Sequence, residues 1–176
     1  MKRLLTMIAV AAAVTLAGVS EAEAGDELPL RAGKSGIQRW NTACESAVQD
    51  GTAVKLVLRK TGGDAWQASA IYNVHRPKAG EMEFAVELST QDKSFHTVHF
   101  YLPIQPKAEG SKVRRRYVRI PMKEFKMDGE VKRYSVKTAI PEEDLAYAGF
   151  GIEFRSKKPA SVTIHSATLT AVSPKD

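Results

Sequence analysis

The chain has 176 residues, of which 43% are hydrophobic and 26% charged, and its formal net charge is +6. This hydrophobic fraction excludes an intrinsically disordered chain, and 12 glycines and 8 prolines are too few for collagen or a low-complexity sequence. The single cysteine, Cys44, excludes an intramolecular disulfide and a Cys-rich zinc module, and we interpret it as a buried apolar residue rather than a catalytic thiol.

Residues 1–24 have the pattern of a secretory signal peptide. Lys2 and Arg3 precede the apolar run Leu4–Val19, and Ala22-Glu23-Ala24 offers the small residues that signal peptidase requires. The run has 16 residues, fewer than the about 20 that a membrane-spanning helix needs, which argues against an uncleaved anchor. We therefore predict cleavage after Ala24, a periplasmic or secreted protein, and no transmembrane segment once the signal is removed.

The rest of the chain is predicted to be a flexible N-terminal arm over residues 25–36 and one β-sandwich domain over residues 37–173. Apolar and polar residues alternate between turn sequences such as Asp50-Gly51 and Asp128-Gly129, and helical periodicity is nearly absent. In chain order the predicted strands are Thr52–Lys60, Trp66–Val74, Glu81–Thr90, Phe95–Ile104, Arg116–Ile120, Arg133–Ile140, Gly149–Arg155 and Ala160–Val172.

Two details refine this series of strands. The last predicted strand is expected to be broken near Ser166, and Pro141–Leu145 is expected to form a short helical turn with acids near its start. We interpret Trp40 and Trp66 as core or sheet-edge anchors. About eight to ten strands with few helices predict an all-β fold, a two-sheet antiparallel β-sandwich of jelly-roll or immunoglobulin-like topology.

The order of these features resembles the jelly-roll carbohydrate-binding modules that share the galactose-binding-like β-sandwich. The segments that carry the resemblance are Trp40, the Asp50-Gly51 turn with Ala53–Leu58, Trp66-Gln67, Gly80–Val86, Arg133–Val136, Gly149–Phe154 and Ser161–Leu169. The resemblance implies a jelly-roll sandwich with a non-catalytic, sugar-binding role. His165-Ser166 stands where those modules often have an Asp, so a structural calcium is not implied.

A candidate binding face follows from strand alternation. In Phe95–Ile104, Val98 and Phe100 share one parity, so His99 and Tyr101 lie on the other, outward parity. If Gly149–Arg155 belongs to the same sheet, Glu153 and Arg155 join them. Aromatic rings stack on sugar rings, and charged groups bind hydroxyls and carboxylates, so this set is our candidate glycan site. The alternative is that His99 and Tyr101 are merely half-buried sheet residues.

Positive charge is concentrated in residues 107–137, which hold eleven Lys and Arg residues and four acids. Within this segment Arg114, Arg115 and Arg116 precede Tyr117, a combination suited to phosphate or carboxylate polymers, and we add these three arginines to the candidate glycan site. The alternative is a solvated edge strand whose cations prevent pairing with other chains. For an exported protein an anionic glycan is a more accessible partner than nucleic acid, which we do not expect to bind.

The sequence contains no constellation for catalysis. His96 and His99 are three apart, so in a strand they point to opposite faces and cannot form a metal pair, and no phosphate loop or nucleophile elbow is present. We predict no enzyme activity, no cofactor and no metal. The first hypothesis is a non-catalytic module for an anionic or cell-envelope glycan. The alternative is an envelope assembly or adaptor sandwich that binds another protein, and a lyase or hydrolase is a distant third.

Overall fold

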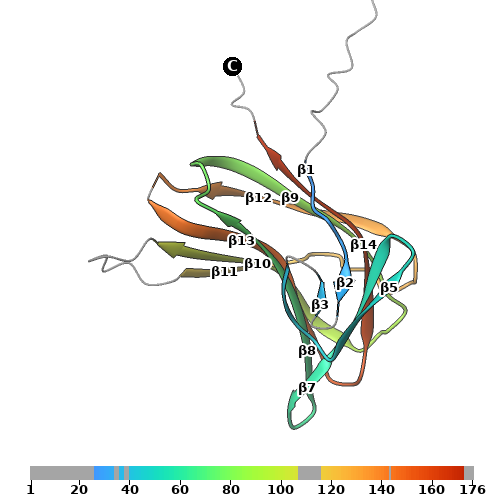
Figure 1. The fold of residues 1–176 in the computed structure, drawn as a ribbon. Coiled ribbons are helices and arrows are strands. Elements are labelled where there is room, and N and C mark those ends of the chain that lie inside the picture. Colours follow the sequence, from blue (N-terminus) through green and yellow to red (C-terminus); the bar gives the residue numbers. More distant parts are fainter. Residues whose placement is uncertain (1–25, 34–35, 38–39, 107–115, 143, 173–176) are drawn as a thin grey trace, which may run out of the picture.

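The computed structural model describes residues 26–33, 36–37, 40–106, 116–142 and 144–172, and these residues form strands, turns and loops without a helix (Figure 1). Sheet I has the strand order β12–β9–β14–β6–β5, with β1 also paired to β14. Its strands are β1 (Asp26–Glu27), β5 (Ser46–Asp50), β6 (Ala53–Val57), β9 (Gly80–Ser89), β12 (Lys132–Ile140) and β14 (Ser161–Ala171).

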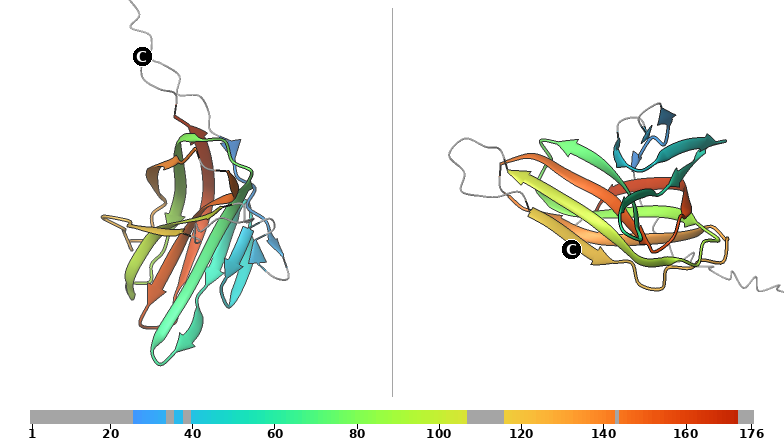
Figure 2. Two further views of the ribbon diagram at one scale, coloured as in Figure 1. Left: turned by 90° about the vertical axis from the view of Figure 1, so that its left-hand side faces the viewer. Right: turned by 90° about the horizontal axis from the view of Figure 1, so that it is seen from below.

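Sheet II has the order β11–β10–β13–β8–β4, with β7 also paired to β8. Its strands are β4 (Trp40–Ala43), β7 (Arg59–Gly62), β8 (Ala65–His75), β10 (Phe95–Pro106), β11 (Arg116–Pro121) and β13 (Leu145–Ser156). A small third sheet joins β2 (Ala32–Gly33) to β3 (Gly36–Ile37). The hairpin of β7 and β8 projects beyond the sandwich at the bottom of Figure 1 and of the left view of Figure 2.

The chain alternates between the two sheets from β8 onward. It passes from β8 in sheet II to β9 in sheet I, returns for β10 and β11, and then continues through β12, β13 and β14 in alternation. All pairings between these strands are antiparallel. Neighbours such as β9 and β14, or β10 and β13, are therefore distant in sequence, as in a jelly roll. The predicted all-β, two-sheet antiparallel sandwich is confirmed.

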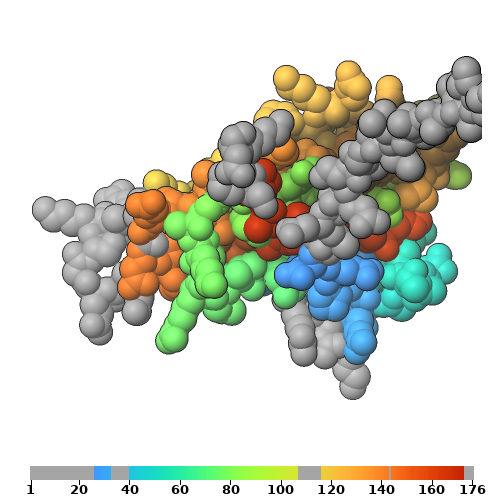
Figure 3. All heavy atoms as spheres, turned by 90° about the horizontal axis from the view of Figure 1, so that it is seen from above, coloured from blue at the N-terminus to red at the C-terminus, as the bar shows by residue number. Residues whose placement is uncertain are grey.

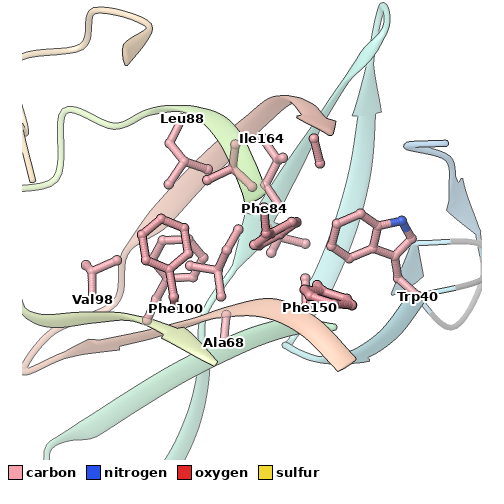
Figure 4. Packing of buried hydrophobic residues seen from close by; sticks show 14 of the residues in the cluster. Trp40, Ala68, Phe84, Leu88, Val98, Phe100, Phe150 and Ile164 are labelled. Atoms are coloured by element: carbon pink, nitrogen blue, oxygen red, sulfur yellow. The ribbon is translucent and has the colours of Figure 1, made fainter. Parts of the chain in front are cut away.

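Apolar side chains of one parity from each sheet fill the space between the sheets. Phe84 of β9 is fully buried, and its ring centroid lies 6.1 Å from those of Phe100 and Phe150 in sheet II (Figure 4). Trp40 closes one end of this core, and its indole Nε1 donates a hydrogen bond of 3.0 Å to the carbonyl of Pro29. The interpretation of Trp40 as a core or edge anchor is thus confirmed, and Trp66 packs partly buried against the same core.

Part of the range that we assigned to a flexible arm is packed against the sandwich. Asp26 and Glu27 pair with Leu169 and Thr168 of β14, and Leu28 is buried in the core with its N–H bonded to the carbonyl of Ala167 at 2.8 Å. The N-terminal residues, blue in Figure 3, accordingly lie against the red atoms of the last strand. The segment is therefore anchored to sheet I at Asp26–Leu28.

Two local predictions differ from the structure. The predicted strand Thr52–Lys60 is two strands, because the chain leaves sheet I after β6 and enters sheet II at β7, with buried Leu58 between them. The predicted helical turn at Pro141–Leu145 is wrong, since Pro141 and Glu142 have no helical assignment and Leu145 begins β13. The predicted break near Ser166 is present as a β-bulge between Ile164 and Ser166.

Across the ranges that the structure describes, no helix has the length and apolar composition to cross a membrane.

Candidate functional site

The candidate site lies on the outer face of sheet II, the face turned away from the core. The pairing of β10 with β13 places His99 opposite Glu153 and Thr97 opposite Arg155, with Tyr101 opposite Gly151. The pairing of β10 with β11 adds Arg119 opposite Tyr101. Because Val98, Phe100, Phe150 and Ile152 are buried in the core, the residues that alternate with them point outward. Gly149–Arg155 therefore lies in the same sheet as His99 and Tyr101.

Glu153 is the electrostatic centre of this face. It is only 2% exposed, and each of its carboxylate oxygens accepts hydrogen bonds from a different arginine. Arg119 Nε donates to Oε2 at 2.6 Å, and Arg155 donates to Oε1 through Nε at 2.9 Å and Nη2 at 2.6 Å. Such charge-assisted bonds are among the stronger hydrogen bonds in proteins. The buried carboxylate thus fixes two guanidinium groups on the surface of the sheet.

The charge of Glu153 is maintained by these partners. Burial alone would raise the pKa of Glu153, but the hydrogen bonds and positive charges of Arg119 and Arg155 outweigh it and hold the pKa below the usual range of a glutamate. The hydrogen bond to Glu153 in turn raises the pKa of Arg119 above its already high value. One negative and two positive charges share this cluster, so the Arg119–Glu153–Arg155 triad carries a net charge of +1 at neutral pH.

Aromatic rings lie beside the triad. Tyr101 and Tyr117 are stacked, with ring centroids 5.9 Å apart and planes inclined by 10°. The guanidinium carbon of Arg119 lies over the Tyr101 ring, 4.8 Å from its centroid, in a cation–π arrangement. Tyr101 is therefore engaged by both neighbours, whereas Tyr117 is 48% exposed. Tyr117, rather than the predicted Tyr101, is the ring that presents more surface to a ligand.

A concavity of about 220 Å³ lies next to these groups. Tyr101, Arg119 and Glu153 line one side of it, while β8 and β4 provide the rest. The lining residues from β8 and β4 are Asn41, Thr42, Ala43, Gln67, Ser69 and Ile71. Two amides, two aliphatic hydroxyls and one guanidinium thus line a concavity beside a stacked pair of rings, which is the composition that a sugar-binding site on a sheet needs.

Two glycines of β13 allow the neighbouring strands to approach closely at the centre of the outer face of sheet II. A Cβ added to Gly149 would lie 2.5 Å from Pro103 Cγ, and one added to Gly151 would lie 2.3 Å from the Ala70 carbonyl oxygen. Ile71 also closes over both positions, within 2.9 Å of either added Cβ. Neighbouring strands therefore occupy the space where side chains of β13 would stand, and the two glycines are required by close approach.

We expect Gly151→Ala to lower the free energy of unfolding by about 1–3 kcal/mol, because the added methyl group must displace backbone of β8. Denaturant titration followed by circular dichroism measures the change. Ser135→Ala, at an exposed position of β12, is the control and should alter stability by less than about 0.5 kcal/mol. Equal stability of Gly151→Ala and the unmodified protein would contradict the close approach of β8 and β13.

The other predicted site residues are placed as follows. Arg155 is an exposed member of the triad. His99 is half-buried, with its Nδ1 buried and lacking a hydrogen-bond partner in the described part of the chain. Arg116 is exposed on β11, but it alternates with Tyr117 and so has the parity opposite to the outer face. Arg114 and Arg115 lie outside the described residues. The structure therefore brings together His99, Tyr101, Glu153 and Arg155, and it separates Arg116 from them.

Sequence reasoning did not single out Arg119, Gln67 or Ser69. Arg119 is two residues from Tyr117, so strand alternation already places both on one face. The alternation of residues 117–119 within the basic segment could therefore have identified Arg119 from the sequence. Gln67 and Ser69 alternate with the buried Ala68 and Ala70, but nothing in the sequence shows that β8 lies beside β13.

Further concavities of the described residues share no lining residue with that of the candidate site. One of them, of about 690 Å³, is lined by Lys93, His96, Lys157 and Lys158 together with the apolar Phe95 and Pro159. No three His, Cys, Asp or Glu side chains of the described ranges cluster as a metal site would need. Cys44 is half-buried, and burial raises the pKa of its thiol, which favours the unreactive protonated form.

Comparison with known proteins supports the fold assignment. The structure is similar to a xylan-binding module, CBM15, at 14% identity and a TM-score of 0.51, covering 86% of this chain and 99% of that one. It is also similar to the CBM22-1–GH10 part of xylanase 10B from Clostridium thermocellum, solved with xylohexaose, at 12% identity and a TM-score of 0.54, covering 85% of this chain and 29% of that one.

A further similar structure comes from work on carbohydrate-binding modules of the β-sandwich superfamily, at 10% identity and a TM-score of 0.52, covering 84% of this chain and 63% of that one. No protein-family model and no curated protein sequence matches the chain. At these identities the likeness establishes the fold. The resemblance to jelly-roll carbohydrate-binding modules is confirmed at that level, and the structural neighbours are mostly such modules.

Proposed function

We propose that this protein is a non-catalytic carbohydrate-binding protein that binds polysaccharide, preferentially an anionic or cell-envelope glycan, through the outer face of sheet II. The observation that carries the proposal is the concavity beside the Tyr101–Tyr117 stack, into which amide, hydroxyl and guanidinium groups converge on rigid strands. The proposal includes export: residues 1–24 act as a signal peptide, and the protein works in the periplasm or outside the cell.

The chemistry of the site fits binding rather than catalysis. Glu153, the one acid among the described residues that line the concavity, is engaged with two arginines through both oxygens, so it is neither a proton donor nor a free base at neutral pH. The rings and amides offer stacking to pyranose C–H groups and hydrogen bonds to hydroxyls. The likeness to carbohydrate-binding modules supports the same reading as an analogy of fold.

The adaptor hypothesis is favoured by one separate observation. β11 forms an edge of sheet II, and it exposes Tyr117 and Val118 at 48% and 41% on opposite parities. An edge strand with exposed apolar residues can pair with a strand of another protein. A glycan array separates the two functions, because a pure protein adaptor binds none of its polysaccharides.

We expect Tyr117→Ala to weaken polysaccharide binding by about 1–3 kcal/mol, the scale for losing an aromatic contact at the centre of an interface. The measurement is calorimetry on the polysaccharide that the array identifies. Val48→Ala is the matched control, since Val48 is similarly exposed but lies on β5 of sheet I. Binding of no polysaccharide by the unmodified protein would overturn the proposed function, and an equal loss in both variants would overturn the site.

A further inference from the structure

The outer face of sheet II carries an excess positive charge at the Arg119–Glu153–Arg155 triad. Among the described residues, Glu153 is the only acid that lines the concavity, and both of its oxygens already accept hydrogen bonds from arginines. Arg119 and Arg155 remain 43% and 46% exposed, so the excess positive charge of the triad is open to the solvent. Glu153 neutralises only one of the two arginine charges, so a ligand with one negative charge would neutralise the other.

Arg119 is the arginine of the triad that lines the concavity. It uses Nε to bind Glu153, and the described residues provide no hydrogen-bond partner for its two Nη atoms. The cation–π contact with the Tyr101 ring and the hydrogen bond to Glu153 together hold the Arg119 guanidinium in place. Two parallel N–H groups of a fixed guanidinium match the two oxygens of a carboxylate, and little side-chain entropy remains to be lost on binding.

Neutral groups around Arg119 suit the rest of a sugar. The amides of Asn41 and Gln67 and the hydroxyl of Ser69 line the opposite side of the concavity, and the exposed Tyr117 ring lies beside Tyr101. In a uronic acid the carboxylate is attached directly to the sugar ring, so the ring stays within reach of these groups. In a sulfate or phosphate ester the anion stands further from the ring, across an ester oxygen.

From this geometry we propose that the site recognises the carboxylate of a uronic acid unit in a polysaccharide, with Arg119 as the residue that determines this specificity. The inference rests on the proposed function and names its ligand class. Arg119 binds the carboxylate through its Nη groups, Tyr117 stacks on the sugar ring, and Glu153 and Arg155 position Arg119 without touching the ligand.

The test uses two pairs of polymers, and the two members of each pair differ only in the anionic group. Calorimetry at physiological salt measures binding of the exported protein to polygalacturonate and to the same polymer after its carboxyl groups are reduced to alcohols. Dextran sulfate and plain dextran form a second pair. We expect polygalacturonate to bind about tenfold or more tighter than its reduced form, and dextran sulfate to gain less over dextran.

Two substitutions of Arg119 and one control assign the effect. Arg119→Gln should lose the preference for polygalacturonate and keep binding to the reduced polymer, and Arg119→Lys should lose most of it, because lysine keeps the charge without the planar fork. Lys137→Gln removes the same charge from an exposed position of β12 on sheet I and should leave the preference intact. Circular dichroism verifies that each variant is folded.

Three outcomes would overturn the inference. If polygalacturonate and its reduced form bind equally well, the site does not recognise a carboxylate, and the proposed function of glycan binding still holds. Sulfation of dextran could raise the affinity as much as the carboxylates of polygalacturonate do, or more. If Lys137→Gln then weakens this binding as much as Arg119→Gln does, the protein attracts polyanions unspecifically through its positive charge. Absence of binding to every polysaccharide on the array overturns the proposed function and this inference together.

Discussion

Replacing Phe84 with Ala is expected to lower the free energy of unfolding by about 3–5 kcal/mol. Phe84 is fully buried, and its ring contacts Phe100 and Phe150 of the opposite sheet. The substitution therefore removes apolar surface and opens a cavity at the point where the two sheets meet. Since domains of this size are stable by about 5–15 kcal/mol, the loss would be a large fraction of the total.

Chemical denaturation followed by tryptophan fluorescence measures this loss. Phe84→Leu is the graded control, because it preserves most of the apolar volume and should cost less than about 1.5 kcal/mol. A loss below about 1 kcal/mol for Phe84→Ala would contradict the position of this ring at the centre of the core. Because the rigid outer face of sheet II depends on that core, glycan binding should also fall with the folded fraction.

The fold was predictable because a half-buried strand has a local sequence pattern, the alternation of apolar and polar residues. The alternation in Glu81–Thr90 and Phe95–Ile104 placed Phe84 and Phe100 in the core, and both are buried. The segment around Leu28 offered only a short signal, since Leu28, Leu30 and Ala32 alternate with Pro29 and Arg31 over just five residues. Its burial depends on the pairing of β1 with β14, which are at opposite ends of the chain.

The candidate site was only partly predictable for a related reason. Alternation within one strand placed His99 and Tyr101 on a common face, but the order of strands in a sheet is not written in local sequence. Arg119 lies 34 residues before Glu153, and the two meet only because β10 lies between β11 and β13. The buried position of Glu153 was likewise hidden, because an acid is rarely buried without its partners.

We expect Glu153→Gln to lower the free energy of unfolding by about 2–3 kcal/mol at neutral pH. Removing one member of a buried ion pair typically costs about 3–5 kcal/mol, and the solvent exposure of Arg119 and Arg155 reduces this, because water still hydrates them when the carboxylate is lost. Glu87→Gln is the control, since Glu87 lies half-buried on sheet I, where its carboxylate accepts a hydrogen bond of 2.9 Å from Ser166 Oγ. That variant should lose less than about 1 kcal/mol.

The pH dependence of this loss tests the ionic origin of the effect. Because the two arginines lower the pKa of Glu153 in the folded protein, its carboxylate stabilises the fold above the usual pKa of a glutamate, and this stabilisation disappears as the pH falls through the lowered folded-state value. The glutamine variant has no such group to titrate. The difference in unfolding free energy between the unmodified protein and Glu153→Gln should therefore be constant near neutral pH and shrink in acid. A difference that stays the same down to strongly acidic pH would show that Glu153 contributes through its shape and neutral hydrogen bonds, and that the triad is not held together by charge.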